Sequence, residues 1–155
     1  MFKLKSKIVR GQSLFEVVIA LGVMSFILVG IVSLAGTSIR NSTFSNNNAL
    51  ASKYTQEGME WIRQERDTTI WSTFSARDAD NSPSPQTATS YCISGLTWVS
   101  GPCGSTTITG TIFTREADLT WVNSDTTDVD VRVSWTDAQG THTVRSSTLF
   151  TNWNR

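Results

Sequence analysis

The chain has 155 residues and a formal net charge of zero, which allows one modest globular domain with an appendage and excludes a large multidomain protein. Four of its thirteen positive charges, Lys3, Lys5, Lys7 and Arg10, lie at the N-terminus. The remainder carries nine positive and thirteen negative charges, a net charge of −4. It therefore has no basic patch that would indicate nucleic acid as a partner.

Residues 17–39 form an apolar run of 23 residues without Lys, Arg, Asp or Glu. A helix of about 20 apolar residues crosses a bilayer. By the positive-inside rule, the preceding cations place the N-terminus in the cytoplasm and the rest of the chain outside. The run is longer than the roughly 7–15 apolar residues of a secretory signal peptide. A plain signal anchor explains its length and orientation but leaves Glu16, at its start, without a role.

The stretch GQSLFE, residues 11–16, resembles the processing site of type IV prepilins and pseudopilins. Members of that family have a short basic leader ending in glycine, a glutamate at the fifth position after the cut, and a long apolar helix. The resemblance implies that a prepilin peptidase cuts after Gly11, so residues 1–11 are the leader and residues 12–39 the assembly helix. The new N-terminus, which the family methylates, is then Gln12, where the family most often has Phe.

Glu16 has two interpretations. In the family, this carboxylate pairs with the α-amino group of an incoming subunit, whose unperturbed pKa is near 8. Such a pair attracts strongly in a medium of low dielectric constant. Ser13 and Glu16 also form an S-x-x-E capping box, in which the carboxylate accepts a backbone N–H bond and complements the helix dipole.

Small residues recur along the apolar run at helical spacing. They form one stripe, made of Gly22, Ser25, Val29, Ser33 and Gly36. Small side chains let helices approach closely, so the stripe is a candidate contact with other pilin subunits. The alternative is that Gly and Ser are simply common in membrane helices.

Residues 40–74 continue as an amphipathic helical pattern. One face carries Leu50, Tyr54, Gly58, Trp61 and Ile62, and charged residues lie largely on the others. We expect either one long helix or two segments with a joint near residues 40–48. The helix is expected to end around Trp71.

Residues 75–155 are predicted to form a β-rich head. Residues 81–90 read as a loop, and the strand-like segments are 97–100, 106–116, 117–123, 128–137 and 141–153. In the clearest strand, Val129, Val131, Val133 and Trp135 share one face, which predicts burial. The predicted class is α+β, a long N-terminal helix packed on a small antiparallel β-meander. The pilin resemblance implies the same architecture, and residues 131–153 look like the last strands of PilV-like minor pilins.

Cys92 and Cys103 lie in the part expected outside the cytoplasm, where a disulfide is plausible. Free buried thiols are the alternative. Two cysteines without a nearby histidine do not make a metal site. Asp125, Asp128 and Asp130 are a further candidate for a hard cation, although turn chemistry explains them equally well.

We find no catalytic constellation and predict neither an enzyme nor a cofactor. The expected function is a minor pilin or pseudopilin of a type IV pilus, or of a related secretion or DNA-uptake filament. The subunit would be held in the cytoplasmic membrane and then enter an extracellular filament or a periplasmic pseudopilus. Nucleic acid would be a partner only through DNA uptake. The alternative is a single-pass anchored binding module with a β-rich extracellular head.

Overall fold

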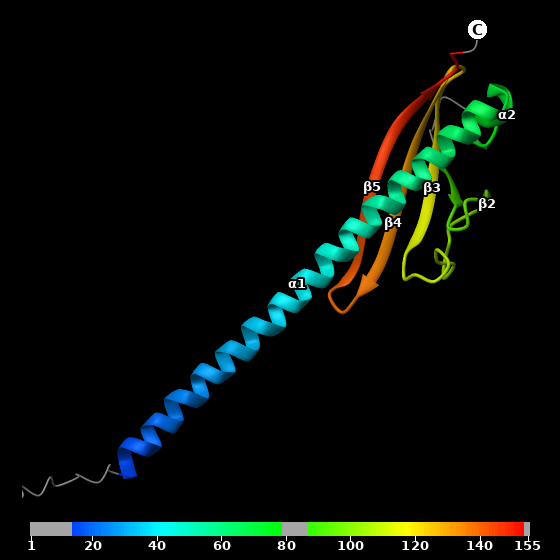
Figure 1. Ribbon diagram of the computed structural model, residues 1–155. Coiled ribbons are helices and arrows are strands. Elements are labelled where there is room, and N and C mark those ends of the chain that lie inside the picture. The colour runs from blue at the N-terminus through cyan, green and yellow to red at the C-terminus, as the bar shows by residue number, and fades with distance from the viewer. Residues whose placement is uncertain (1–13, 79–86, 154–155) are drawn as a thin grey trace, which may run out of the picture. The chain divides into compact units, whose positions relative to one another are not determined.

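The computed structural model describes residues 14–78 and 87–153, which fall into two compact units, residues 1–44 and 45–155. The helix α1 (Leu14–Thr68) has 55 residues and contributes to both units (Figure 1). Of the two expected alternatives, the single long helix is therefore confirmed. The helix-weak residues 41–48 stay helical because extending an existing helix costs less than nucleating a second one.

The helix ends at Thr68, slightly earlier than expected, and a short helix α2 (Trp71–Ser75) follows. Ile70, the residue before α2, is extended, with φ −63° and ψ 136°. Consecutive β-branched residues at positions 68–70 favour this departure from helical geometry. Trp71 thus starts a new element instead of ending the first one.

The head contains a five-stranded antiparallel sheet in the order β2-β1-β3-β4-β5. The strands are β1 (Thr89–Cys92), β2 (Val99–Ser100), β3 (Thr114–Asn123), β4 (Thr126–Asp137) and β5 (Gly140–Thr151). The antiparallel meander expected from the sequence is formed by β3, β4 and β5. The turn expected at residues 137–140 is also present, since Asp137 pairs with Gly140 across a two-residue loop.

Two sequence expectations for the head were wrong. The segment 106–113 forms a turn-rich loop in place of a strand, and Ile108 N–H donates to the Phe113 carbonyl over 2.7 Å. Gly110 in this loop has a φ of 74°, which a β-strand does not accommodate. Conversely, β1 includes Thr89 and Ser90, which were expected in a loop. Residues 81–86 of that expected loop lie outside the described part of the chain.

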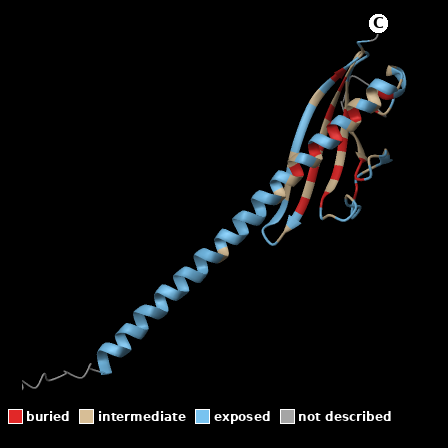
Figure 2. Cartoon of the chain, viewed as in Figure 1, coloured by how far each residue is buried: buried red, intermediate tan, exposed pale blue. Residues whose placement is uncertain are grey.

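The core of the head lies between the sheet and the second half of α1. Val129, Val131, Val133 and Trp135 are buried, as the alternation in β4 predicted. Figure 2 shows buried residues on the strands and on the part of α1 that crosses them. The helix contributes a face of buried residues, namely Ala51, Thr55, Gly58, Met59 and Ile62. The α+β prediction is therefore confirmed: a long helix packs on an antiparallel sheet.

Gly58 is where α1 approaches the sheet most tightly among its described glycines. A Cβ atom at this position would lie 2.8 Å from Arg115 Cδ and 3.1 Å from Val131 Cγ1. Both neighbours are buried and cannot easily move. We expect Gly58→Ala to destabilise the head by roughly 1 kcal/mol, because overpacking outweighs the better helix propensity of alanine.

Thermal unfolding of the full chain, followed by tryptophan fluorescence, measures this effect. Gly30→Ala is the matched control, because its added Cβ would meet no atom within 4 Å. An unfolding temperature for Gly58→Ala at or above that of the unmodified chain would contradict the close packing.

Candidate assembly and processing site

The described part of the first unit, residues 14–44, consists of the apolar half of α1. Its large apolar side chains are exposed; Leu14 is 82% exposed and Phe26 is 83% exposed. Within the described residues, α1 is the one helix long and apolar enough to cross a membrane, with a mean hydropathy of 2.8 over its most apolar window. Burying each such side chain is worth about 1.5–3 kcal/mol. This half of the helix therefore gains stability from a lipid or protein environment.

Glu16 lies in the first turn of α1, where its charge complements the positive end of the helix dipole. It is exposed and forms no ion pair with any residue that the structure describes. The next charged residue along the helix is Arg40, which lies about 36 Å away at 1.5 Å per residue. A cationic partner for Glu16 would thus come from the N-terminal segment or from another molecule.

Several predicted site residues fall outside the described part of the chain. Gly11 and Gln12, the expected processing site, belong to residues 1–13, as does Ser13 of the expected capping box. The structure therefore leaves cleavage and capping as predictions.

The stripe of small residues lies on one side of α1. At 100° per residue, Gly22, Ser25, Val29, Ser33 and Gly36 fall within an arc of about 80°. No side chain occupies the space that a Cβ would take at Gly22 or Gly36. The Ser25 hydroxyl donates to the Leu21 carbonyl over 2.8 Å, so its hydrogen-bonding capacity is met within the helix. This side therefore carries small side chains, which suits close helix contact in an apolar medium.

The head holds a buried charge that the sequence reasoning missed, Arg115 of β3. Its side chain is 1% exposed. Nε donates to the Ile93 carbonyl and Nη1 to the Tyr54 carbonyl and the Glu57 carboxylate, each over 3.1 Å. Desolvation lowers the pKa of Arg115, and the charge of Glu57 opposes that effect. The guanidinium therefore ties α1 to the sheet.

The expected disulfide between Cys92 and Cys103 is present, with a Cα–Cα distance of 4.6 Å. It closes the segment that contains Ile93 and Ser94, whose carbonyls Arg115 binds. Cys103 N–H also donates to the Glu116 carboxylate over 2.7 Å. The covalent link and the buried arginine thus fix the same part of the head.

The outer face of the sheet, which points away from α1, carries paired charges. Arg132 Nε donates to Glu116 over 2.8 Å, and Nη1 binds Asp118. Desolvation lowers the pKa of Arg132, but the bonds to these carboxylates outweigh it and raise the pKa overall. Desolvation raises the pKa of Asp130, although Arg145, 4.0 Å away, opposes the effect. The two arginines of this face therefore neutralise only part of the charge of its carboxylates.

The aspartates considered for a cation do not gather into a metal site. Within residues 14–78 and 87–153, no group of three His, Cys, Asp or Glu side chains could hold a metal ion. Asp130 instead faces Arg145, and Asp125 accepts the backbone N–H of Asn152 through its carbonyl over 2.8 Å.

His142 contacts Asp137 over 2.9 Å, and this hydrogen bond lowers the pKa of Asp137.

Comparisons with protein-family models, curated proteins and solved structures found no match. The functional argument therefore depends on the residues and their geometry. These separate into an apolar helix with one acid at its start and a compact head held by Arg115 and a disulfide.

Proposed function

We propose that this chain is a prepilin-like subunit, a minor pilin or pseudopilin of a type IV pilus or of a related secretion or DNA-uptake filament. The observation that carries the proposal is Glu16. It is an exposed carboxylate in the first turn of α1, the 23 residues that follow it carry no charge, and no described residue neutralises it. The resemblance of residues 11–16 to a prepilin processing site supplies the missing partner.

Cleavage after Gly11 by a prepilin peptidase creates an α-amino group on Gln12, four residues before Glu16. The helix holds the subunit in the cytoplasmic membrane until assembly. There the amine of one subunit pairs with Glu16 of its neighbour. In an apolar surrounding an unpaired charge is costly, so the pair favours docking in one register.

The helix offers two different sides to its neighbours. Glu16 lies about 120° around the helix axis from Gly22, which belongs to the stripe of small residues. A subunit in a helical filament contacts more than one neighbour, so two separate contact sides suit such an assembly. The charge pair sets the register on one side, and the small residues permit close packing on the other.

The N-terminus of protein purified from its native host tests this proposal. We expect intact-mass spectrometry to give a mature chain that starts at Gln12, because the peptidase removes residues 1–11. Gly11→Val is the control, and its bulkier side chain should leave Met1 in place. A native chain that retains Met1 would instead support a single-pass anchored binding module.

A further inference from the structure

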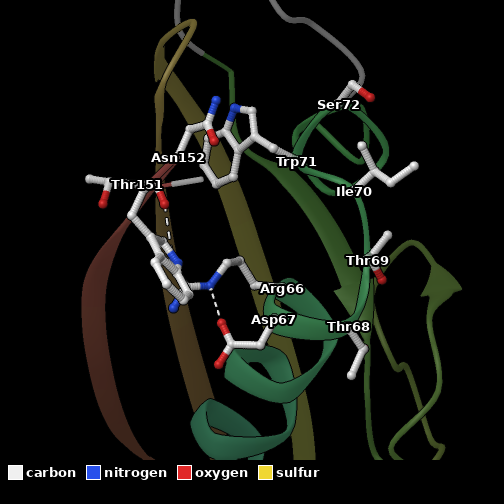
Figure 3. Close-up of a pocket in the computed structure, with 10 residues that line it drawn as sticks. Arg66, Asp67, Thr68, Thr69, Ile70, Trp71, Ser72, Thr151 and Asn152 are labelled. Atoms are coloured by element: carbon white, nitrogen blue, oxygen red, sulfur yellow. Dashed lines mark hydrogen bonds and ion pairs between the residues drawn. The ribbon is translucent and has the colours of Figure 1, made fainter. Parts of the chain in front are cut away.

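A pocket of about 510 Å³ lies at the end of the head where α1 gives way to α2. Figure 3 shows its lining, which brings the segment 66–72 next to the end of β5. Ten residues line it: Arg66, Asp67, Thr68, Thr69, Ile70, Trp71, Ser72, Thr151, Asn152 and Trp153. Its volume lies in the range of roughly 300–1,000 Å³ that is usual for small-ligand sites. The proposed filament contacts use none of these residues.

Two tryptophans give the pocket aromatic walls. Trp71 is held in place, because its indole N–H donates to the Ser124 carbonyl over 2.9 Å. Trp153 is 69% exposed, and Ile70, which also lines the pocket, is 76% exposed. A large indole face that stays in water is available for stacking on a ligand.

The pocket is lined by one positive and one negative side chain, Arg66 and Asp67, which neutralise each other. Arg66 Nε lies 2.6 Å from an Asp67 carboxylate oxygen, and Nη1 donates to the Thr151 carbonyl over 3.3 Å. The Arg66 guanidinium also lies 5.5 Å from the ring centroids of both Phe150 and Trp153. A second cation stacked on Trp153 would therefore lie close to this guanidinium and be repelled by it. The anion that an acidic ligand would supply is already present as Asp67.

The remaining lining residues are neutral, and apart from Ile70 and the two tryptophans they are polar. The hydroxyls of Thr69, Ser72 and Thr151 donate no hydrogen bond to any group in the described part of the chain. An apolar ligand would remove water from these hydroxyls without replacing its hydrogen bonds, which is costly. A saccharide matches the combination, since its hydroxyls replace that water and its C–H faces stack on indole.

From these contacts we propose that the pocket binds a neutral saccharide, with the exposed face of Trp153 as the stacking platform. Three properties support this choice of ligand: the exposed indole, the cancelled charge and the uncommitted hydroxyls. The inference depends on the head alone and stands whether or not the chain enters a filament.

The test uses the full chain in lauryldimethylamine oxide, a detergent without a sugar headgroup. Maltotriose and chitotriose are the neutral probes, 3′-sialyllactose is the anionic probe, and trilysine is the cationic probe. Isothermal titration calorimetry is expected to give a dissociation constant below about 1 mM for a neutral probe and weaker binding for both charged probes.

Trp153→Ala is expected to weaken neutral-probe binding by about tenfold or more, as the loss of one stacking contact implies. Trp153→Phe keeps an aromatic face and should remain within about threefold of the unmodified chain. Leu149→Ala, which alters an exposed side chain outside the pocket, is the control. Unchanged unfolding temperatures show that the variants remain folded.

Three outcomes would overturn the proposal. They are the failure of both neutral probes to bind at several millimolar, binding that Trp153→Ala leaves unchanged, and tighter binding of a charged probe than of a neutral one. The mass of the mature N-terminus is unaffected by each of these, so this proposal and the filament proposal fail separately.

Discussion

Arg115→Ala is expected to lower the free energy of unfolding of the head by about 3–5 kcal/mol. The substitution removes a side chain that is 1% exposed and leaves a cavity between α1 and the sheet. It also removes hydrogen bonds from a charged donor to the carbonyls of Ile93, Ser94 and Tyr54. Urea unfolding followed by tryptophan fluorescence measures the loss.

Arg115→Met separates packing from hydrogen bonding. Methionine fills much of the volume of the arginine stem but donates no hydrogen bond. It also removes the cost of burying a charge, and Glu57, which is 47% exposed, stays hydrated. We therefore expect a smaller loss, about 2 kcal/mol.

Arg145→Ala is the matched control for both variants. This arginine is 62% exposed and lies 4.0 Å from Asp130 on the outer face, so its removal should change stability by less than about 0.5 kcal/mol. If Arg115→Ala is as mild as Arg145→Ala, the buried guanidinium does not hold α1 to the sheet.

The elements that the sequence predicted correctly are those with long, regular patterns. The apolar run and the face that includes Gly58 and Ile62 repeat at helical spacing over many turns, and they gave α1. The alternation from Val129 to Trp135 gave β4, because every second residue is buried. Each repeat of such a pattern indicates burial of the same face, so a long pattern predicts a helix or a strand more clearly than a short one.

The errors lie where long-range contacts decide the structure. Residues 106–113 have the Thr- and Ile-rich composition of a strand. However, Gly110 adopts a positive φ, and the nearby Cys103 is bonded to Cys92. The amino-acid composition of these eight residues reveals neither the positive φ nor the disulfide. The strand β1 was missed because four residues are too few to show a period.

The alternation in β3 offered a clue to Arg115. It shares a face with Ala117 and Leu119, both fully buried. A charged residue at an inward position therefore implies a buried partner. The partners themselves, carbonyls at positions 54, 93 and 94, are brought together only by the folded head.

The head and the apolar half of α1 are stabilised in different ways. The described apolar half of α1 is exposed and has no packing partner among the described residues of its own unit, so burial in a membrane or against another protein would stabilise it. The head has its own core, a disulfide and paired surface charges. Under the filament proposal, this division would let the head stay folded while the surroundings of the helix change from lipid to other subunits.

Glu16→Gln is expected to leave a chain that inserts into the membrane but enters filaments at least about tenfold less efficiently. Glutamine is nearly the same size and still serves in a capping box, so the helix should lose only the interaction of the charge with its dipole, about 0.3–1 kcal/mol. It carries no charge, so the proposed attraction to the α-amino group of a neighbour would be lost. At an effective dielectric constant near 20, two unit charges 4 Å apart attract by about 4 kcal/mol, and a loss of 1.4 kcal/mol already corresponds to tenfold.

Quantitative immunoblotting of sheared filaments and of the membrane fraction measures both parts of this prediction. Glu60→Gln is the matched control: it makes the same change at an exposed position of α1 within the head, where Glu60 pairs with Arg63. Incorporation of Glu16→Gln at the level of Glu60→Gln would show that Glu16 serves only the helix end. Reduced incorporation with unchanged membrane content would instead assign to Glu16 a contact between subunits, because capping alone does not distinguish the two side chains.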